Sequence, residues 1–274
     1  MNIQFEKDGR KYVTDLDSGT SIAIDLDFDG LQPNHFEAQK ATRQPIVVGD
    51  FVGSINRGAG CNVDTITLVP HCNGTHTESV GHIVNQSVSV AQLAKQSFFF
   101  AKLVTVDPTN DHDGNSYVPE LRAEDQIVDV TQLRDAIGET KVGAVEAVIV
   151  RTTPNNKGKR SRIYGADAVP AFFSSEAMKL VVEIQAQHLL VDLPSVDRMH
   201  DDGKLSNHHL FWNVERGKSE LNDNTRVAQT ITEMIYVPNE LQDGDYLLNL
   251  QIAPFYCDAA PARPILFPVT EIEK

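Results

Sequence analysis

The chain has 274 residues, of which 41% are hydrophobic and 23% are charged, and its formal net charge is −14. These proportions are ordinary for a globular protein that buries a full core, and a charge of this sign repels nucleic acid and anionic membranes. We therefore expect neither as a partner. Three cysteines in a chain of this size do not indicate a disulfide framework.

Targeting and membrane segments are not expected. No apolar run approaches the roughly 20 residues that a membrane span needs. Residues 1–7 have neither the basic start nor the apolar core of a signal peptide, so a cytoplasmic location is expected. The sequence also lacks internal repeats, low-complexity tracts and an obvious linker, which favours one domain over residues 1–274.

The first 60 residues are rich in Gly and Asp and show no clear periodicity. We expect this segment to be irregular and to contribute to a substrate pocket or to an oligomer contact. Residues 65–69 are β-branched and apolar, which predicts a strand leading into the next motif.

That motif is PHCNGTHTESVGH at residues 70–82, and five of its thirteen side chains can bind a metal. Alternate residues of an extended chain face the same side, so Cys72, His76 and Glu78 are expected to converge, with Gly74 leaving space for an ion. Thiolate, imidazole and carboxylate form a ligand set typical of zinc. The alternative is a surface loop that happens to be rich in histidine.

Downstream patterns predict a mixed α/β protein. The expected elements, in chain order, are a buried strand at 98–106, a helix at 130–137, a strand at 145–152, a helix at 174–187, a strand at 188–192, and strands at 245–252 and 264–269. Ser174 is a suitable N-cap for its helix. The order strand–helix–strand over 145–192 forms a βαβ unit, so the sheet is at least partly parallel.

Two charged segments are interpreted as turns. Residues 109–120 match part of the spacing of a calcium-binding EF-hand loop, but Thr109 cannot supply the carboxylate of its first position. The basic run at 157–162 is interpreted as a solvated turn.

A second group of polar residues could complete the site begun at 72–78. Candidates lie at 192–197 and at 207–212, where His208 and His209 are either site residues or a surface pair. Glu233 lies in an apolar run, and burying a lone carboxylate costs several kcal/mol unless it is paired or bound to metal. The run is equally consistent with an edge strand on which Glu233 faces solvent.

Together these motifs resemble the cyclase-like metal-dependent hydrolases, the family that includes bacterial kynurenine formamidase and isatin hydrolase. The family signature His-x-Gly-Thr-His-x-Asp-x-x-x-His overlies residues 72–82. Later motifs of the family are similar to residues 191–197, 208–212, 231–235 and 258–263, so that the resemblance covers roughly residues 60–270.

The resemblance implies a layered β/β/α fold of the swivelling kind and a homodimer or homotetramer. It also implies one or two ions, Zn²⁺ or alternatively Mn²⁺. One ion would be held by Cys72, His76, Glu78 and Glu233, and the other by Glu78, His208 and Glu233.

The implied reaction is hydrolysis of an amide, formamide or lactam bond in a small cyclic or aromatic substrate. Metal-bound hydroxide would be the nucleophile and His82 the general acid/base. A metal-dependent cyclase or dehydratase, or a metal- or metabolite-binding protein without turnover, are the alternatives.

The sequence departs from the family pattern in three places. Cys72 replaces a histidine, Glu78 replaces an aspartate, and residues 213–227 form an insertion. Glu reaches about 1.5 Å further than Asp, by one carbon–carbon bond, which reshapes the site. His71 could replace the missing histidine, but its odd position in an extended chain would turn it to the other face, so we favour Cys72.

Overall fold

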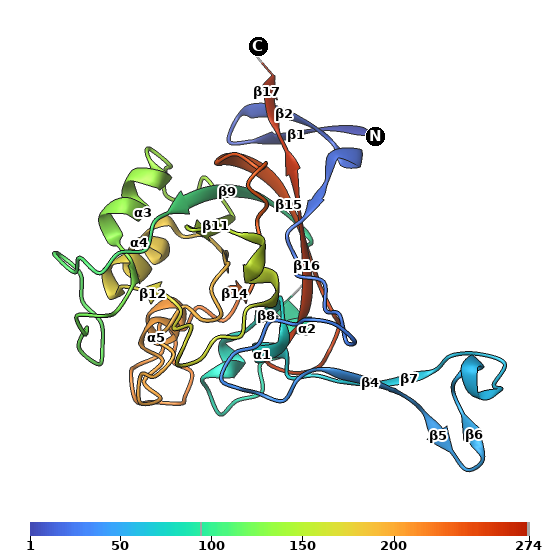
Figure 1. Ribbon diagram of the computed structural model, residues 1–274. Helices are drawn as coiled ribbons and strands as arrows, with labels where there is room; N and C mark the ends of the chain where they lie inside the picture. The colour runs from blue at the N-terminus through green and yellow to red at the C-terminus, as the bar shows by residue number, and fades with distance from the viewer. Residues whose placement is uncertain (94, 273–274) are drawn as a thin grey trace.

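The computed structural model describes residues 1–93 and 95–272. Its centre is a mixed eight-stranded sheet whose strand order is β15-β9-β11-β13-β14-β8-β16-β3, and β15 also pairs with β16, which closes the sheet into a barrel (Figure 1). In chain order these strands are β3 (Thr20–Ser21), β8 (His76–Glu78), β9 (Phe98–Val106), β11 (Ala147–Thr152), β13 (His188–Val191), β14 (Thr230–Glu233), β15 (Gly244–Ile252) and β16 (Ala259–Pro268).

The parallel half of the barrel runs from β9 through β11 and β13 to β14. The helices α3 (Val130–Ile137) and α4 (Ser175–Ile184) lie side by side against it, and α5 (Ser206–Trp212) packs on α4 (Figure 1). Because β11 and β13 are parallel with α4 between them, the predicted βαβ unit over 145–192 is confirmed. Ser174 caps α4 as predicted, since its side chain accepts a hydrogen bond from the backbone N–H of Ala177.

The N-terminal segment is more regular than the sequence suggested. The strands β1 (Asn2–Lys7) and β2 (Arg10–Asp15) form a hairpin that β17 (Thr270–Ile272) extends. Its turn is Asp8–Gly9, both with positive φ, and an Asp-Gly pair favours this tight turn. Residues 42–67 form an arm that protrudes from the barrel (Figure 1). It consists of β4 (Thr42–Pro45), β5 (Val47–Val48), β6 (Phe51–Val52) and β7 (Asp64–Thr67).

The remaining elements are short. They are the helices α1 (Pro70–Asn73) and α2 (Val90–Leu93), the paired strands β10 (Ile127–Val128) and β12 (Phe172–Phe173), and 3₁₀ turns at Leu16–Ser18, Ile55–Arg57, Val80–His82 and Lys157–Ser161. Among the residues described, no helix is long and apolar enough to cross a membrane.

The basic run at 157–162 is not simply a solvated turn. Lys159 is buried, and its Nζ lies 2.7 Å from Oδ2 of the buried Asp192. Asp192 also accepts hydrogen bonds from the backbone N–H and the hydroxyl of Thr152. The solvated interpretation was wrong for Lys159 because a buried carboxylate at the end of β13 needs a counter-charge.

A buried histidine in the barrel wall makes stability sensitive to acid. Burial lowers the pKa of His188 to about 4, and its Nδ1 lies 2.7 Å from the Thr230 hydroxyl. An unfolded histidine titrates near 6.5, so this contribution to stability is complete above about pH 6.5 and is lost as the pH falls toward 4.

We expect the free energy of unfolding to fall by about 2 kcal/mol between pH 7 and pH 5 because of His188 alone. Urea unfolding of the wild type and of His188→Leu at both pH values measures this difference, with His112→Leu as a control on a loop. An unchanged pH dependence in His188→Leu would contradict the expectation.

Candidate metal and active site

The candidate site is built around the short strand β8. Its antiparallel pairing with β14 sets Glu233 opposite His76, and its pairing with β16 sets Ala259 opposite Glu78. His76, Glu78 and Glu233 are all buried. The alternative in which Glu233 faces solvent is therefore wrong, because β14 is an inner strand of the barrel.

Glu78 is surrounded by imidazoles. Its Oε1 lies 2.9 Å from His208 Nε2, and its Oε2 lies 3.1 Å from His71 Nδ1 and 3.9 Å from His82 Nε2. Burial alone would raise the pKa of Glu78, but the charges of His82 and His208 hold that pKa well below its usual range. The site thus places the Glu78 carboxylate among three imidazole rings, those of His71, His82 and His208.

His208 and His76 are each fixed through one ring nitrogen. His208 Nδ1 lies 2.5 Å from Asp197 Oδ2, and His76 Nδ1 lies 3.0 Å from the carbonyl oxygen of Gly74. The Nε2 atom of His76 is buried without a hydrogen-bond partner, 3.5 Å from Glu233 Oε2. Histidines that bind metal through one nitrogen usually donate the other N–H to a carboxylate or carbonyl, so these contacts fit a metal site.

Three groups of side chains bring possible ligand atoms within 4.8 Å of one another. They are His71 with His76 and Glu78; Glu78 with His82 and His208; and His71 with His82 and Asp258. Glu233 lies at the edge of the first two, with its Oε1 3.8 Å from His208 Nε2. The structure therefore brings together four of the expected ligands: His76, Glu78, His208 and Glu233.

The prediction that His71 faces away from the site is wrong. The chain is extended over 76–78, but residues 70–73 form α1, so the alternation of an extended strand does not apply to Cys72. His71 consequently faces Glu78, whereas Cys72 belongs to none of the three groups. Cys72 is buried, and its burial together with the charge of Glu233 raises its pKa.

Sequence reasoning missed the roles of two carboxylates. Asp197 orients His208, and Asp258 lies 2.9 Å from His71 Nε2 and 3.6 Å from His82 Nδ1. The hydrogen bond from His71, together with the nearby His82, lowers the pKa of Asp258. Both residues stand in motifs that the sequence had singled out, at 192–197 and 258–263, but only the fold shows which side chains they contact.

The family model described as "Putative cyclase" matches residues 17–198. The chain belongs to this family.

One curated protein and two solved structures show further similarity to the chain. A kynurenine formamidase of Bacillus cytotoxicus is 24% identical over 214 residues, which cover 76% of this chain and 81% of that protein. Isatin hydrolase A from Ralstonia solanacearum superimposes with a TM-score of 0.58 at 14% identity, covering 91% of each chain. A "predicted metal-dependent hydrolase" from Bacillus stearothermophilus has a TM-score of 0.56 at 15% identity, with 91% and 97% covered. The predicted cyclase-family fold is confirmed.

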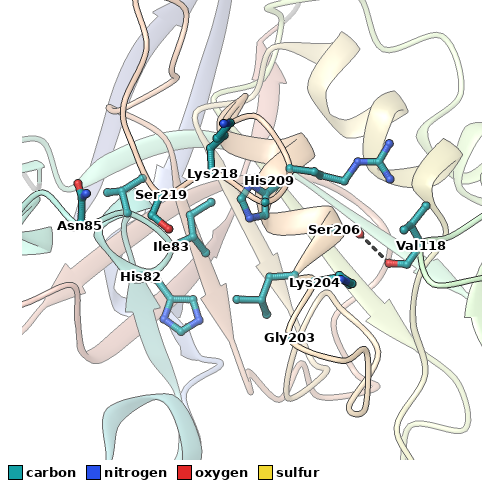
Figure 2. Close-up of a pocket in the computed structure, with 14 residues that line it drawn as sticks. His82, Ile83, Asn85, Val118, Gly203, Lys204, Ser206, His209, Lys218 and Ser219 are labelled. Atoms are coloured by element: carbon teal, nitrogen blue, oxygen red, sulfur yellow. Dashed lines mark hydrogen bonds between the residues drawn. The ribbon is translucent and has the colours of Figure 1, made fainter.

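In this cyclase-family chain a pocket of about 800 Å³ opens beside His82. The segment that follows β8 lines one part of it, with His82, Ile83 and Asn85 (Figure 2). Gly203, Lys204, Ser206 and His209, at the start of α5, line another part. His82 is 27% exposed at its side chain, so it joins the buried cluster to a space that a small molecule can enter.

Proposed function

We propose that this protein is a metal-dependent hydrolase of an amide, formamide or lactam bond in a small cyclic or aromatic substrate. The observation that carries the proposal is the buried Glu78 between His71 and His208, next to the unpartnered Nε2 of His76. The names of its relatives, a kynurenine formamidase and isatin hydrolases, support a carbon–nitrogen bond as the target.

The donor set fits divalent ions, with zinc favoured and manganese as the alternative. Imidazole and carboxylate ligands suit both, and a zinc ion bound by them polarises a carbonyl and lowers the pKa of water toward 7. We assign one position to His71, His76, Glu78 and Glu233, and a second to Glu78, His208 and Glu233. The contacts of His71 favour it over Cys72 as the first ligand.

His82 is placed to move a proton at the substrate. Its Nδ1 faces Asp258 at 3.6 Å, which leaves Nε2 directed toward Glu78 and the pocket. A neutral Nε2 can take a proton from the attacking water, and the imidazolium can then donate it to the leaving nitrogen. Asp258 fixes the tautomer that this exchange requires, as a positioning residue.

The first ligand is tested by two alanine variants. We expect His71→Ala to lower the bound metal per chain by more than half, because it removes an imidazole 3.1 Å from Glu78, and Cys72→Ala to leave the metal content unchanged. Mass spectrometry of the metal in both purified variants decides between them. If Cys72→Ala loses the metal and His71→Ala keeps it, Cys72 is the ligand and our assignment of His71 is wrong.

The reaction is tested with a panel of N-formyl aromatic amines, small lactams, esters and lactones, each assayed with zinc and with manganese. We expect turnover of amide or lactam substrates, with weak activity on N-formylkynurenine because Cys72 and Glu78 alter the family's pattern. Conversion of a substrate without addition of water would instead favour the cyclase or dehydratase alternative. No turnover of any member by metal-loaded protein would favour a binding protein.

Two further expectations stay predictions. A homodimer or homotetramer is checked by light scattering of the purified protein. A cytoplasmic location is checked by cell fractionation.

A further inference from the structure

The pocket beside His82 has an unusual distribution of charge for so acidic a protein. Three cationic side chains line it, those of Arg216 and of Lys204 and Lys218, the last two labelled in Figure 2. No aspartate or glutamate is among the described residues that line it. The whole chain has 38 acidic residues against 24 lysines and arginines. A cluster of one sign in a cleft focuses the electrostatic field there and raises the local concentration of the opposite charge.

These three cations are not neutralised by nearby carboxylates. Within the described part of the chain, none of them forms an ion pair at 4.0 Å or less, whereas buried cations elsewhere, such as Lys159 and Arg198, do. His209 is engaged within the protein, because its Nδ1 lies 3.2 Å from the carbonyl oxygen of Val214. The pocket therefore presents three positive charges that are available to a ligand.

Besides polar residues such as Asn85, Ser206 and Ser219, four apolar residues line the pocket. Ile83, Val84, Val118 and Leu205 contribute hydrophobic side chains, and His82 stands at the end that leads to Glu78. A ligand that fits has an apolar or aromatic body and an anionic group at a distance from the bond near His82. Arg216 and Lys218 lie in the 213–227 segment, which we interpret as an insertion relative to the family pattern.

We infer that this pocket binds a carboxylate of the substrate, and that the substrates are aromatic acids that carry a separate amide or formamide group. The choice of the bond to be cleaved rests on the proposed function, but the binding of the carboxylate does not. Lys204, Arg216 and Lys218 hold the carboxylate, and the apolar wall holds the ring while its carbonyl lies near His82.

Equilibrium binding tests the carboxylate site without turnover. Benzoate and the neutral benzamide are titrated into the metal-loaded wild type, into Lys204→Gln/Arg216→Gln/Lys218→Gln, and into the control Lys11→Gln/Arg57→Gln/Lys141→Gln. The control replaces two exposed lysines and one exposed arginine outside the pocket. It therefore has the same net charge as the test variant.

We expect benzoate to bind wild type and control about tenfold more tightly than benzamide at low salt, and the pocket variant to lose this preference. Circular dichroism and metal content show that the pocket variant is folded and loaded. An equal affinity of benzoate and benzamide in the wild type would overturn the inference. An undiminished preference for benzoate in the pocket variant would overturn it too, because the carboxylate would then be bound elsewhere, as by the metal.

Kinetics separate this inference from the proposed function. N-formylanthranilate and formanilide share the formamide bond and differ in the carboxylate. We expect the pocket variant to lower kcat/KM about tenfold for the first, mainly through KM, and to leave the second unchanged. If the wild type hydrolyses neither compound, this counts against the proposed function and leaves the benzoate result standing. If the pocket variant loses kcat/KM equally for both compounds, this contradicts the carboxylate site.

Discussion

Replacing His82 with alanine is expected to lower kcat for amide hydrolysis by about 10²–10⁴-fold while the metal content stays at the wild-type level. The physical reason is that His82 is the side chain that reaches from the pocket toward Glu78, with Asp258 behind its other nitrogen. Its loss removes the group that moves the proton and leaves His71, His76, Glu78 and His208 in place. Steady-state kinetics and metal analysis on the same preparation measure both quantities.

His112→Ala is the matched control, because it removes an imidazole from a loop outside the site. We expect it to keep the activity of the wild type. If His82→Ala keeps full activity, His82 has no catalytic role. If it loses activity and metal together, His82 is a ligand, and the general acid/base lies elsewhere.

The second large effect is expected from Glu78→Gln. This substitution keeps the shape of a fully buried side chain but removes the negative charge that stands between His71 and His208. We expect metal affinity to fall by more than about 100-fold, and amide hydrolysis to fall with it. This exceeds the effect of removing a residue that only hydrogen-bonds to a metal ligand. Metal competition with a chromogenic chelator measures the first quantity and steady-state kinetics the second.

Glu176→Gln provides the control for Glu78→Gln. Glu176 lies at the start of α4, outside the site, and accepts hydrogen bonds from Ser116. Its loss is expected to cost less than about 1 kcal/mol of stability and to leave metal binding unchanged. Wild-type metal affinity in Glu78→Gln would remove this carboxylate from the ligand set.

Local patterns predicted much of the fold because they depend on nearby residues. The helix at 130–137 and the βαβ unit follow from apolar periodicity and from the cap at Ser174, and both are confirmed. The hairpin of β1 and β2 was missed although Asp8–Gly9 is a turn signal, because its two strands are short and β1 is only partly buried.

The site was harder to predict because its contacts join residues that are distant in the sequence. His71 faces Glu78, against the expectation for an extended chain, because Pro70 opens a helical turn, and proline is favoured at that first position. Asp258 reaches His71 and His82 only because β16 pairs with β8. No periodicity within one segment could have shown this contact.

Anomalous diffraction from crystals grown with zinc or manganese and without a chelator tests the central claim most directly. We predict a peak about 2.0–2.2 Å from His76 Nε2 and from a carboxylate oxygen of Glu78, with any second peak close to His208 Nε2. A map without a peak between His76, Glu78 and His208 in metal-soaked crystals would contradict it.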